Sequence, residues 1–426
     1  MKFVLTSWGS RGEVEPCSAV GRELLARGHD VCMAVPPDLA GIPEAAGLAT
    51  VAYGPDFGAI LDAYREFWTT FFGSFWKLQD LAKFGKEMSE PLQYWDEMSR
   101  MLTSLASGAD LLFTTPGFEM LVANVADYHD IPLATLHWSP LRPNGQLYPF
   151  VPAPLGRAAM MVRACLSRGG AAKKVEQAQR RELRLPEARG SWPRRIIERG
   201  TLEIQAYDEV CFPGLAAEWA KWNGQRPFVG ALTLELPTAD DQEVASWIAA
   251  GTPPIFFGFG SVPVAAAGDT LAVIGAACEE LGERALVGAA GTDFTRAPHF
   301  DHVKVVDTLN YGAVFPACRA VVHRGSSGIT AAGLRAGVPT LILSTDLYQT
   351  LSGTHVKRLK VGTARRFAAT TRESLIEDLR TILSPAYVAA ARELATRMTK
   401  PEESAVKAAD LLENFARSRR SAGRRM

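Results

Sequence analysis

The stretch AVVHRGSSGITAAG, residues 320–333, decides the fold of this chain of 426 residues. An apolar segment runs directly into small residues, and residues 329–336 then have the composition of a helix. A strand that ends in Gly and Ser and leads directly into a helix is typical of an anion-binding site, because the first helical turn has free N–H groups and the positive end of the helix dipole. A simple tight turn of an α/β fold explains the same pattern. The residues that we expect to contact a diphosphate here are His323, Gly325, Ser326, Ser327 and Gly328.

Polar side chains also follow the next predicted strand, Thr340–Leu343. The residues GVP at 337–339 end the predicted helix, and STDLYQ at 344–349 comes directly after the strand. In open α/β sheets, ligands bind outside the carboxyl ends of adjacent strands. We therefore expect Asp346, Tyr348 and Gln349 to lie beside the anion site.

The composition is that of an ordinary globular protein, with 46 Lys and Arg residues against 46 Asp and Glu residues. This balance gives no overall field that would favour nucleic acid. The six cysteines form no Cys-x-x-Cys pair and no Cys/His cluster, so they indicate neither a zinc site nor a disulfide framework and fit a reducing cytoplasm. The apolar run at the N-terminus is too short for a signal peptide, and no stretch predicts a membrane span.

The strongest local charge bias is the Arg-rich tail at 417–425. A disordered end is the first interpretation of this tail. Contact with anionic lipid headgroups, at the inner face of the plasma membrane, is the alternative.

The N-terminal half predicts one series of alternating strands and helices. A strand at 3–6 is followed by a loop with Gly9 and Gly12, a helix from Pro16 to about Arg27 and a strand at 31–35. Further along, residues 153–205 are expected to be helical. The strand-like segments that follow are 209–212 and 228–229.

Aromatic residues interrupt this rhythm between 57 and 105. Six large rings at helical spacings are more than one core-facing side needs, so an apolar ligand groove is an alternative to a simple core. His137 and Trp138 lie at the end of a predicted strand at 132–137, although a lone His is more often structural than catalytic. The residues that we expect to bind an acceptor are Phe67, Trp68, Phe71, Phe72, Phe75, Trp76, His137 and Trp138.

A second α/β series begins after an acid- and Pro-bearing segment. The fold class is therefore α/β with two domains, residues 1–229 and 243–400, joined by a linker at 230–242. Asp240 and Asp241 in the linker predict a solvated pair rather than metal ligands. A helix at about 402–418 is expected to pack back on the first domain. The strands expected in the second domain are 255–261, 285–287, 303–306, 320–322 and 340–343.

Several spaced motifs resemble those of the GT-B fold glycosyltransferases that act on bacterial natural products and sterols. GSRGEVEP at 9–16 resembles the family's GSRGDxxP opening, and HRGSSGIT at 323–330 resembles its HHGGAGTT signature. GFGS at 258–261 and RAGVP at 335–339 fall in the same register. The resemblance spans nearly the whole chain. The mixed charge and the Arg-rich ending resemble the actinobacterial branch, including mycobacterial enzymes that glycosylate lipopeptides.

The resemblance implies two Rossmann-like domains facing each other across a cleft. It also implies that a sugar moves from a dTDP- or UDP-sugar, as co-substrate, to a hydroxyl of an apolar acceptor such as a lipopeptide, glycolipid or other natural product. The transfer is expected to invert the anomeric carbon and to need no metal or other cofactor. Such a displacement needs a base for the acceptor hydroxyl and stabilisation of the departing diphosphate.

Glu13 stands at the position of the family's candidate base, an Asp in the first loop. Arg11 nearby is expected to keep Glu13 ionised. The alternative is that Glu13 only caps the helix that follows. His323 and Asp346 are the other residues expected at the reacting centre. The remaining expected donor contacts are Ser10, Arg11, Gly12, Ser261, Leu309, Tyr348 and Gln349.

Three features depart from the family pattern. Glu13 is one methylene longer than Asp. Arg324 replaces a His, and Ser326 and Ser327 replace Gly and Ala. Tyr348 stands where the family has an Asp before Gln349, and the nearest carboxylate is Asp346. These changes keep two other hypotheses open, namely a nucleotide-sugar epimerase on the same fold and a non-catalytic protein that binds nucleotide sugars.

Overall fold

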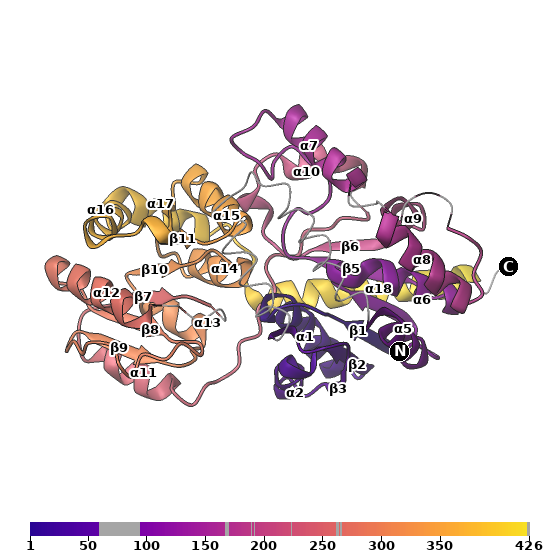
Figure 1. Ribbon diagram of the computed structural model, residues 1–426, viewed down its shortest axis with the longest axis horizontal. Helices are drawn as coiled ribbons and strands as arrows, with labels where there is room; N and C mark the ends of the chain where they lie inside the picture. The colour runs from indigo at the N-terminus through magenta and orange to yellow at the C-terminus, as the bar shows by residue number, and fades with distance from the viewer. Residues whose placement is uncertain are drawn as a thin grey trace.

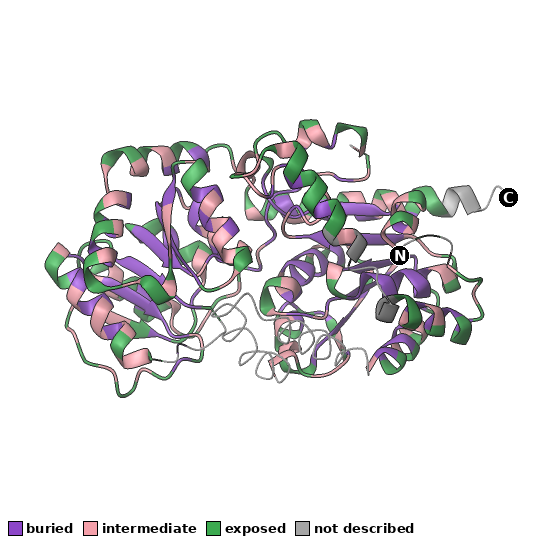
Figure 2. Cartoon of the chain, turned by 45° about the horizontal axis from the view of Figure 1, so that its top comes forward, coloured by how far each residue is buried: buried purple, intermediate pink, exposed green. Residues whose placement is uncertain are grey.

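The computed structural model describes residues 1–58, 94–166, 170–188, 190, 192–222, 224–260, 264 and 266–423. Two parallel six-stranded sheets lie side by side, each with helices on both faces (Figure 1). The central strands of both sheets are buried and the helices expose their outer faces (Figure 2), as expected for parallel sheets covered on both sides. The predicted α/β class is confirmed.

The first sheet has the strand order β3-β2-β1-β4-β5-β6. Its strands are β1 (Lys2–Thr6), β2 (Asp30–Val35), β3 (Ala49–Ala52), β4 (Leu111–Thr114), β5 (Leu133–His137) and β6 (Leu202–Gln205). The helices connected to it are α1 (Arg11–Ala26), α2 (Gly41–Ala45), α5 (Trp95–Leu105), α6 (Glu119–His129), α7 (Ala153–Leu166), α8 (Gly170–Glu182), α9 (Trp192–Glu198) and α10 (Leu215–Glu218).

The second sheet has the strand order β12-β11-β10-β7-β8-β9. Its strands are β7 (Ile255–Gly258), β8 (Ala285–Gly288), β9 (Val303–Val306), β10 (Ala320–His323), β11 (Thr340–Ser344) and β12 (Gly362–Arg366). Its helices are α11 (Asp241–Ala249), α12 (Ala267–Leu281), α13 (Tyr311–Val314), α14 (Ser327–Arg335), α15 (Leu347–Arg358), α16 (Arg372–Ile382) and α17 (Pro385–Ala395).

The last helix, α18 (Pro401–Gly423), leaves the second sheet and lies along the first (Figure 1). Ala408, Ala409 and Leu412 are buried in the same cluster as the strand β1. At the surface, Arg27 of α1 forms an ion pair of 2.6 Å with Asp410. The chain therefore crosses between the two sheets twice, once before β7 and once before α18.

The two crossings meet at Arg335, in the last turn of α14. Its guanidinium donates to the Ala231 carbonyl of the first crossing and to Ser404 Oγ of the second, the latter at 3.1 Å. Asp208, which follows β6, lies 4.0 Å from the same guanidinium and accepts from the Thr399 backbone N–H at 2.7 Å. Arg335 therefore joins both crossings to one helix of the second sheet.

Several predicted boundaries were wrong. The first helix begins at Arg11, five residues before Pro16, because Ser10 and Glu13 form a capping box. The segment 209–212 contains a short 3₁₀ turn, and the strand is β6, inside the stretch predicted to be helical. Its side chains Glu203 and Gln205 are polar although they are buried, so the pattern of a core strand is hidden. The strands β3 and β12 were not predicted.

Candidate active site

The anion-binding turn lies between β10 and α14. Gly325 has a φ of 104°, and a Cβ at this position would lie 2.8 Å from Ile342 Cγ2. Only glycine adopts this turn without strain. The turn places Ser326 at the N-cap of α14, where its side chain makes no capping hydrogen bond. The N–H groups of the first helical turn have no partner within the helix, so this end of α14 can bind an anion.

His323 ends β10 and has no exposed surface. Its Nδ1 lies 2.8 Å from the Gly325 backbone N–H, which can only donate. The proton of the neutral ring is therefore on Nε2, and this atom has no hydrogen-bond partner among the described residues. Burial lowers the pKa of His323 to about 3, so the ring is a neutral donor at physiological pH. A buried donor without a partner is costly, and a ligand oxygen would satisfy it.

The loop after β11 lies against the same turn, since the Gln349 carbonyl would be 3.2 Å from a Cβ on Gly325. Asp346 is the N-cap of α15 and accepts from the Gln349 backbone N–H at 2.9 Å. Gln349 Oε1 in turn accepts from the Thr345 backbone N–H at 2.7 Å. Burial raises the pKa of Asp346. Tyr348 is half-exposed at the start of α15. Asp346 and Gln349 thus hold the loop, and the backbone of Gln349 lies beside Gly325.

Glu13 lies after β1, in the first turn of α1. Its Oε2 accepts from the Ser10 backbone N–H at 2.6 Å, which is the capping role considered from the sequence. Burial raises the pKa of Glu13 to about 7, against the opposing effect of this hydrogen bond. A carboxyl group with a pKa near neutrality is suited to general-base catalysis. Capping and proton transfer use the same side chain and do not exclude each other.

Gly9 makes room for this carboxylate. A Cβ at Gly9 would overlap the carboxyl group of Glu13. In the sequence, Gly9 stands out only as part of a loop motif. The motif predicts that Gly9 lies in the loop. That this position must lack a side chain becomes clear only when the carboxyl group of Glu13 is placed beside it.

The expected pairing of Arg11 with Glu13 is wrong. Arg11 binds Glu15, one turn further along α1, with Nε 2.9 Å from Oε2. Glu15 also accepts from the Leu234 backbone N–H at 3.2 Å, so the pair attaches α1 to the first crossing between the sheets. Glu13 consequently keeps a raised pKa rather than a lowered one.

The other predicted donor residues are distributed as follows. Ser10 is the N-cap of α1, and Gly12 lies in its first turn. Leu309 is buried in the apolar cluster beside β9 and α13. Ser327 and Gly328 lie in the first turn of α14. Ser261 lies outside the described residues, as do the aromatic residues expected to bind an acceptor, Phe67, Trp68, Phe71, Phe72, Phe75 and Trp76.

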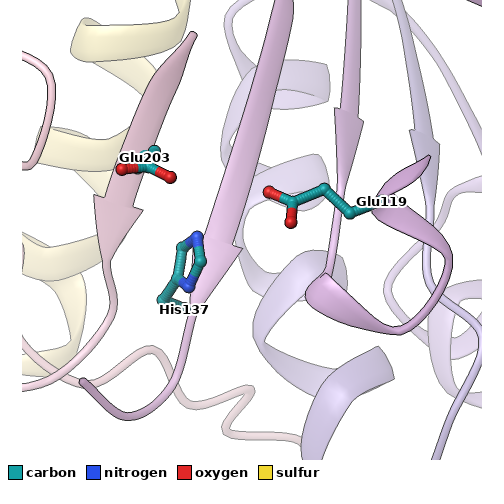
Figure 3. A group of neighbouring side chains, drawn as sticks. All are labelled: Glu119, His137 and Glu203. Carbon is teal, nitrogen blue, oxygen red and sulfur yellow. The ribbon is translucent and has the colours of Figure 1, made fainter. Parts of the chain in front are cut away.

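His137 belongs to a buried polar group rather than to an exposed face. His137 ends β5, Glu203 lies in β6 and Glu119 begins α6, and their ligand atoms lie within 4.8 Å of one another (Figure 3). All three side chains are almost completely buried. Burial and the charge of Arg142 lower the pKa of His137 to about 3. Trp138, the next residue, is half-buried.

This group has the spacing of metal ligands but the chemistry of an ion-pair network. Arg142 donates to Glu203 and, at 2.5 Å, to Glu119. Arg226 donates to Glu203 at 2.6 Å. Two guanidinium groups thus balance two carboxylates, and the group has no net negative charge to attract a further cation. We conclude that the network supports the carboxyl ends of β5 and β6.

Each of the two loops that carry the predicted reacting groups follows a strand at the reversal point of its sheet. The strand order reverses between β1 and β4 in the first sheet and between β10 and β7 in the second. Ligands of doubly wound sheets bind at these reversal points, outside the carboxyl ends of the strands. Glu13 follows β1, and Gly325 follows β10.

Comparison with known proteins shows the family and the fold of this chain. Residues 286–412 match the family described as erythromycin biosynthesis protein CIII-like, C-terminal domain. A glycosyltransferase of Mycobacterium leprae is 55% identical over 99% of this chain and 98% of its own length. Among the described residues, no helix combines the length and the apolar character needed to cross a membrane.

Solved structures show the same fold at low identity. The calicheamicin glycosyltransferase CalG4 superposes with a TM-score of 0.69 at 15% identity, covering 97% of this chain and 98% of that one. The glycosyltransferase VinC, solved in complex with dTDP, gives a TM-score of 0.63 at 16% identity, covering 98% and 100%. The chain belongs to the actinobacterial glycosyltransferases of the GT-B fold.

Proposed function

We propose that this enzyme is an inverting glycosyltransferase that moves a sugar from a dTDP- or UDP-sugar to a hydroxyl of an apolar acceptor. The acceptor class is a lipopeptide, a glycolipid or another natural product. The observation that carries this proposal is the turn at Gly325, where the open end of α14 and the unpartnered Nε2 of His323 meet.

The leaving diphosphate would lie on this turn. Backbone N–H groups of Ser327 and Gly328 would receive its negative charge together with the dipole of α14. His323 would add a neutral donor that needs no change of protonation state. These groups supply the charge stabilisation that a divalent cation otherwise gives, so the proposed reaction uses neither a metal nor another cofactor.

Glu13 would take the proton of the acceptor hydroxyl. With a pKa of about 7, it is partly ionised at neutral pH and can both accept a proton and release it afterwards. Attack of the acceptor oxygen on the anomeric carbon, opposite to the departing diphosphate, inverts that carbon. Asp346 and Tyr348, beside the turn, would contact the sugar hydroxyls.

The proposed site of action is the cytoplasm, where nucleotide sugars and reduced cysteines coexist, at the inner face of the plasma membrane. The apolar acceptor and the Arg-rich end of the chain support this placement. The aromatic residues at 67–76 remain the predicted acceptor contacts.

The test is a thermal-shift screen of dTDP, UDP and their sugars, followed by transfer assays with an acceptor panel in the presence of EDTA. We expect stabilisation by one nucleoside diphosphate and product formation without added metal. The anomeric configuration of the product, read by NMR, checks inversion. A shift with none of the nucleotides would overturn the donor assignment. Donor turnover without any acceptor would indicate an epimerase, and binding without turnover would indicate a non-catalytic protein.

A further inference from the structure

Leu147, in the loop that follows β5, contacts a helix of the second sheet. Its side chain is buried in a small apolar cluster with Met160 of α7 and Leu351 of α15. Its carbonyl lies 3.3 Å from Nε2 of His355, one turn further along α15. Burial lowers the pKa of His355 to about 4, so the ring is neutral at physiological pH and donates to this carbonyl through Nε2. Leu147 therefore binds α15 both through its side chain and through its backbone.

The loop that carries Leu147 is fixed by its own hydrogen bonds. Asn144 is fully buried, and its Oδ1 accepts from the backbone N–H groups of Gln146 and Leu147 at 2.7 and 2.8 Å. Its Nδ2 donates to the carbonyls of Pro140 and Arg142 at 2.9 and 2.8 Å. The guanidinium of Arg142 belongs to the buried ion-pair network of the first sheet. The position of Leu147 is therefore set by the first sheet, although it contacts a helix of the second.

The loop at 344–349 is joined to the start of the same helix. Two of its hydrogen bonds, described above, connect Gln349 in the first turn of α15 with the residues before the helix. A third runs from Thr350 Oγ1 to Ser344 Oγ at 3.0 Å. A displacement of α15 therefore displaces this loop, which carries the residues proposed to contact the donor sugar.

The opposite side of α15 packs on its own sheet. Val356 is buried in a cluster with Ile342 of β11. A Cβ at Gly353 would lie 2.5 Å from the Cβ of Ala364 in β12, so the helix and the sheet are in close contact. The helix is thus held from two sides, by the second sheet and by Leu147. The anion-binding turn, in contrast, leads into α14, so the contact of Leu147 bears on the sugar more than on the diphosphate.

We propose that Leu147 is a positioning residue for the donor sugar, because its contact with α15 holds the loop at 344–349 in place. This inference rests on the proposed function for the ligand, a nucleotide sugar. It gives the first domain a part in donor recognition: the sugar is bound in the reactive position only while the two domains are in contact at α15.

The first arm of the test is hydrogen–deuterium exchange of the full chain without a ligand. Leu147→Ala removes the side-chain contact, so we expect faster exchange of the Thr345 and Gln349 backbone amides, which are hydrogen-bonded within the loop. Leu147→Met keeps the volume and should exchange like the wild type. The matched control is Leu379→Ala, a buried leucine of α16, which should leave the exchange of these amides unchanged. If Leu147→Ala does not fold, Leu147→Val should give the same pattern at a smaller size.

A double-mutant cycle extends this arm. Leu351→Ala removes the same contact from the side of α15. Two residues that act through one contact are not additive, so the double variant should exchange no faster than the more severe single variant.

The second arm compares the binding of dTDP with that of dTDP-glucose, and of UDP with that of UDP-glucose, in calorimetry. Leu147→Ala should keep the affinity for the nucleoside diphosphate and lose the additional affinity that the glucose gives. In transfer assays its kcat should fall by about ten- to a hundredfold, because a small misplacement of a reacting group is costly. Leu147→Met should restore both properties.

The proposal is overturned if Leu147→Ala leaves the exchange of the loop amides unchanged, or if Leu379→Ala accelerates it equally. It is also overturned if the effects of Leu147→Ala and Leu351→Ala simply add, or if Leu147→Ala weakens the diphosphate and its sugar by the same factor. A wild type that binds none of these nucleotides contradicts the proposed donor instead, and the exchange results then still decide whether Leu147 holds the loop.

Discussion

The replacement Glu13→Gln tests both the chemistry and the electrostatics of the loop after β1. Glutamine keeps the size of the side chain and an oxygen that can accept from the Ser10 backbone N–H, so the cap of α1 is retained. The group that takes a proton is lost. General-base catalysis contributes about 10² to 10⁴ in rate, so we expect kcat to fall by that factor while donor binding is unchanged.

The replacement should also change how kcat/KM and stability depend on pH. For the wild type, kcat/KM should rise as the pH passes about 7, because Glu13 must lose its proton to act as a base. Stability should change in the opposite direction. The pKa is higher in the folded state than the ordinary value of 4.5, so the stabilisation from the bound proton is present below pH 4.5 and is lost as the pH rises through about 7. At about 1.4 kcal/mol for each pKa unit, this loss is about 2 to 3 kcal/mol, where the lower figure allows for solvent contact of the half-buried side chain.

The variant has no such proton. Relative to the wild type, Glu13→Gln should therefore gain stability at pH 8 but not at pH 4, as measured by urea unfolding at both values. Initial-rate assays between pH 5 and 9 give the kinetic half of the test. Undiminished transfer by the variant, or an inflection near pH 7 that survives the replacement, would refute the assignment of Glu13 as base. A companion variant, Gly9→Ala, keeps the carboxylate but displaces it, and should also lose activity.

Three further replacements test other parts of the molecule. Gly325→Ala puts a side chain on a backbone at φ 104°, which costs about 1 to 3 kcal/mol, so calorimetry should show at least tenfold weaker binding of the nucleoside diphosphate; unchanged affinity would contradict the anion site. Arg142→Met leaves Glu119 and Glu203 without a shared partner and should cost about 3 to 5 kcal/mol of unfolding free energy in urea, a result that a change below about 1 kcal/mol would disprove. Arg335→Met removes the contacts that join the two crossings and should widen the distribution of domain distances in small-angle scattering and raise the KM for the donor; identical scattering curves would count against it.

The sequence predicted the backbone features of the site better than the environments of its side chains. The turn at Gly325 could be predicted because a strand, small residues and a helix follow one another directly along the chain. The partner of Arg11 could not, since Glu13 and Glu15 are both within reach on one helix and only the helix start at Ser10 decides between them.

The strand β6 shows why long-range contacts limit such predictions. In the sequence, Glu203 is typical of a surface residue. In the structure it is buried, because Arg142 and Arg226 from other parts of the chain form ion pairs with it in the interior. His137 lies beside this network because the same long-range contacts bring Glu203 and Arg142 to the end of β5. Its place at a strand end suggested an acceptor contact, but a residue at a strand end can equally be buried and structural. The pKa of Glu13 depends on how far the surrounding elements bury its carboxyl group, and this burial cannot be predicted from the spacing of residues along the chain.

The return of α18 to the first sheet has a consequence for synthesis. Ala408, Ala409 and Leu412 complete a core that begins at Phe3, so the first domain lacks part of its interior until the end of the chain has left the ribosome. During translation, the second domain can complete its sheet before α18 is available to pack on the first domain. The order of maturation is thus the reverse of the order of synthesis, and a nascent chain arrested before residue 400 should be more sensitive to proteases in its N-terminal half than in its C-terminal half.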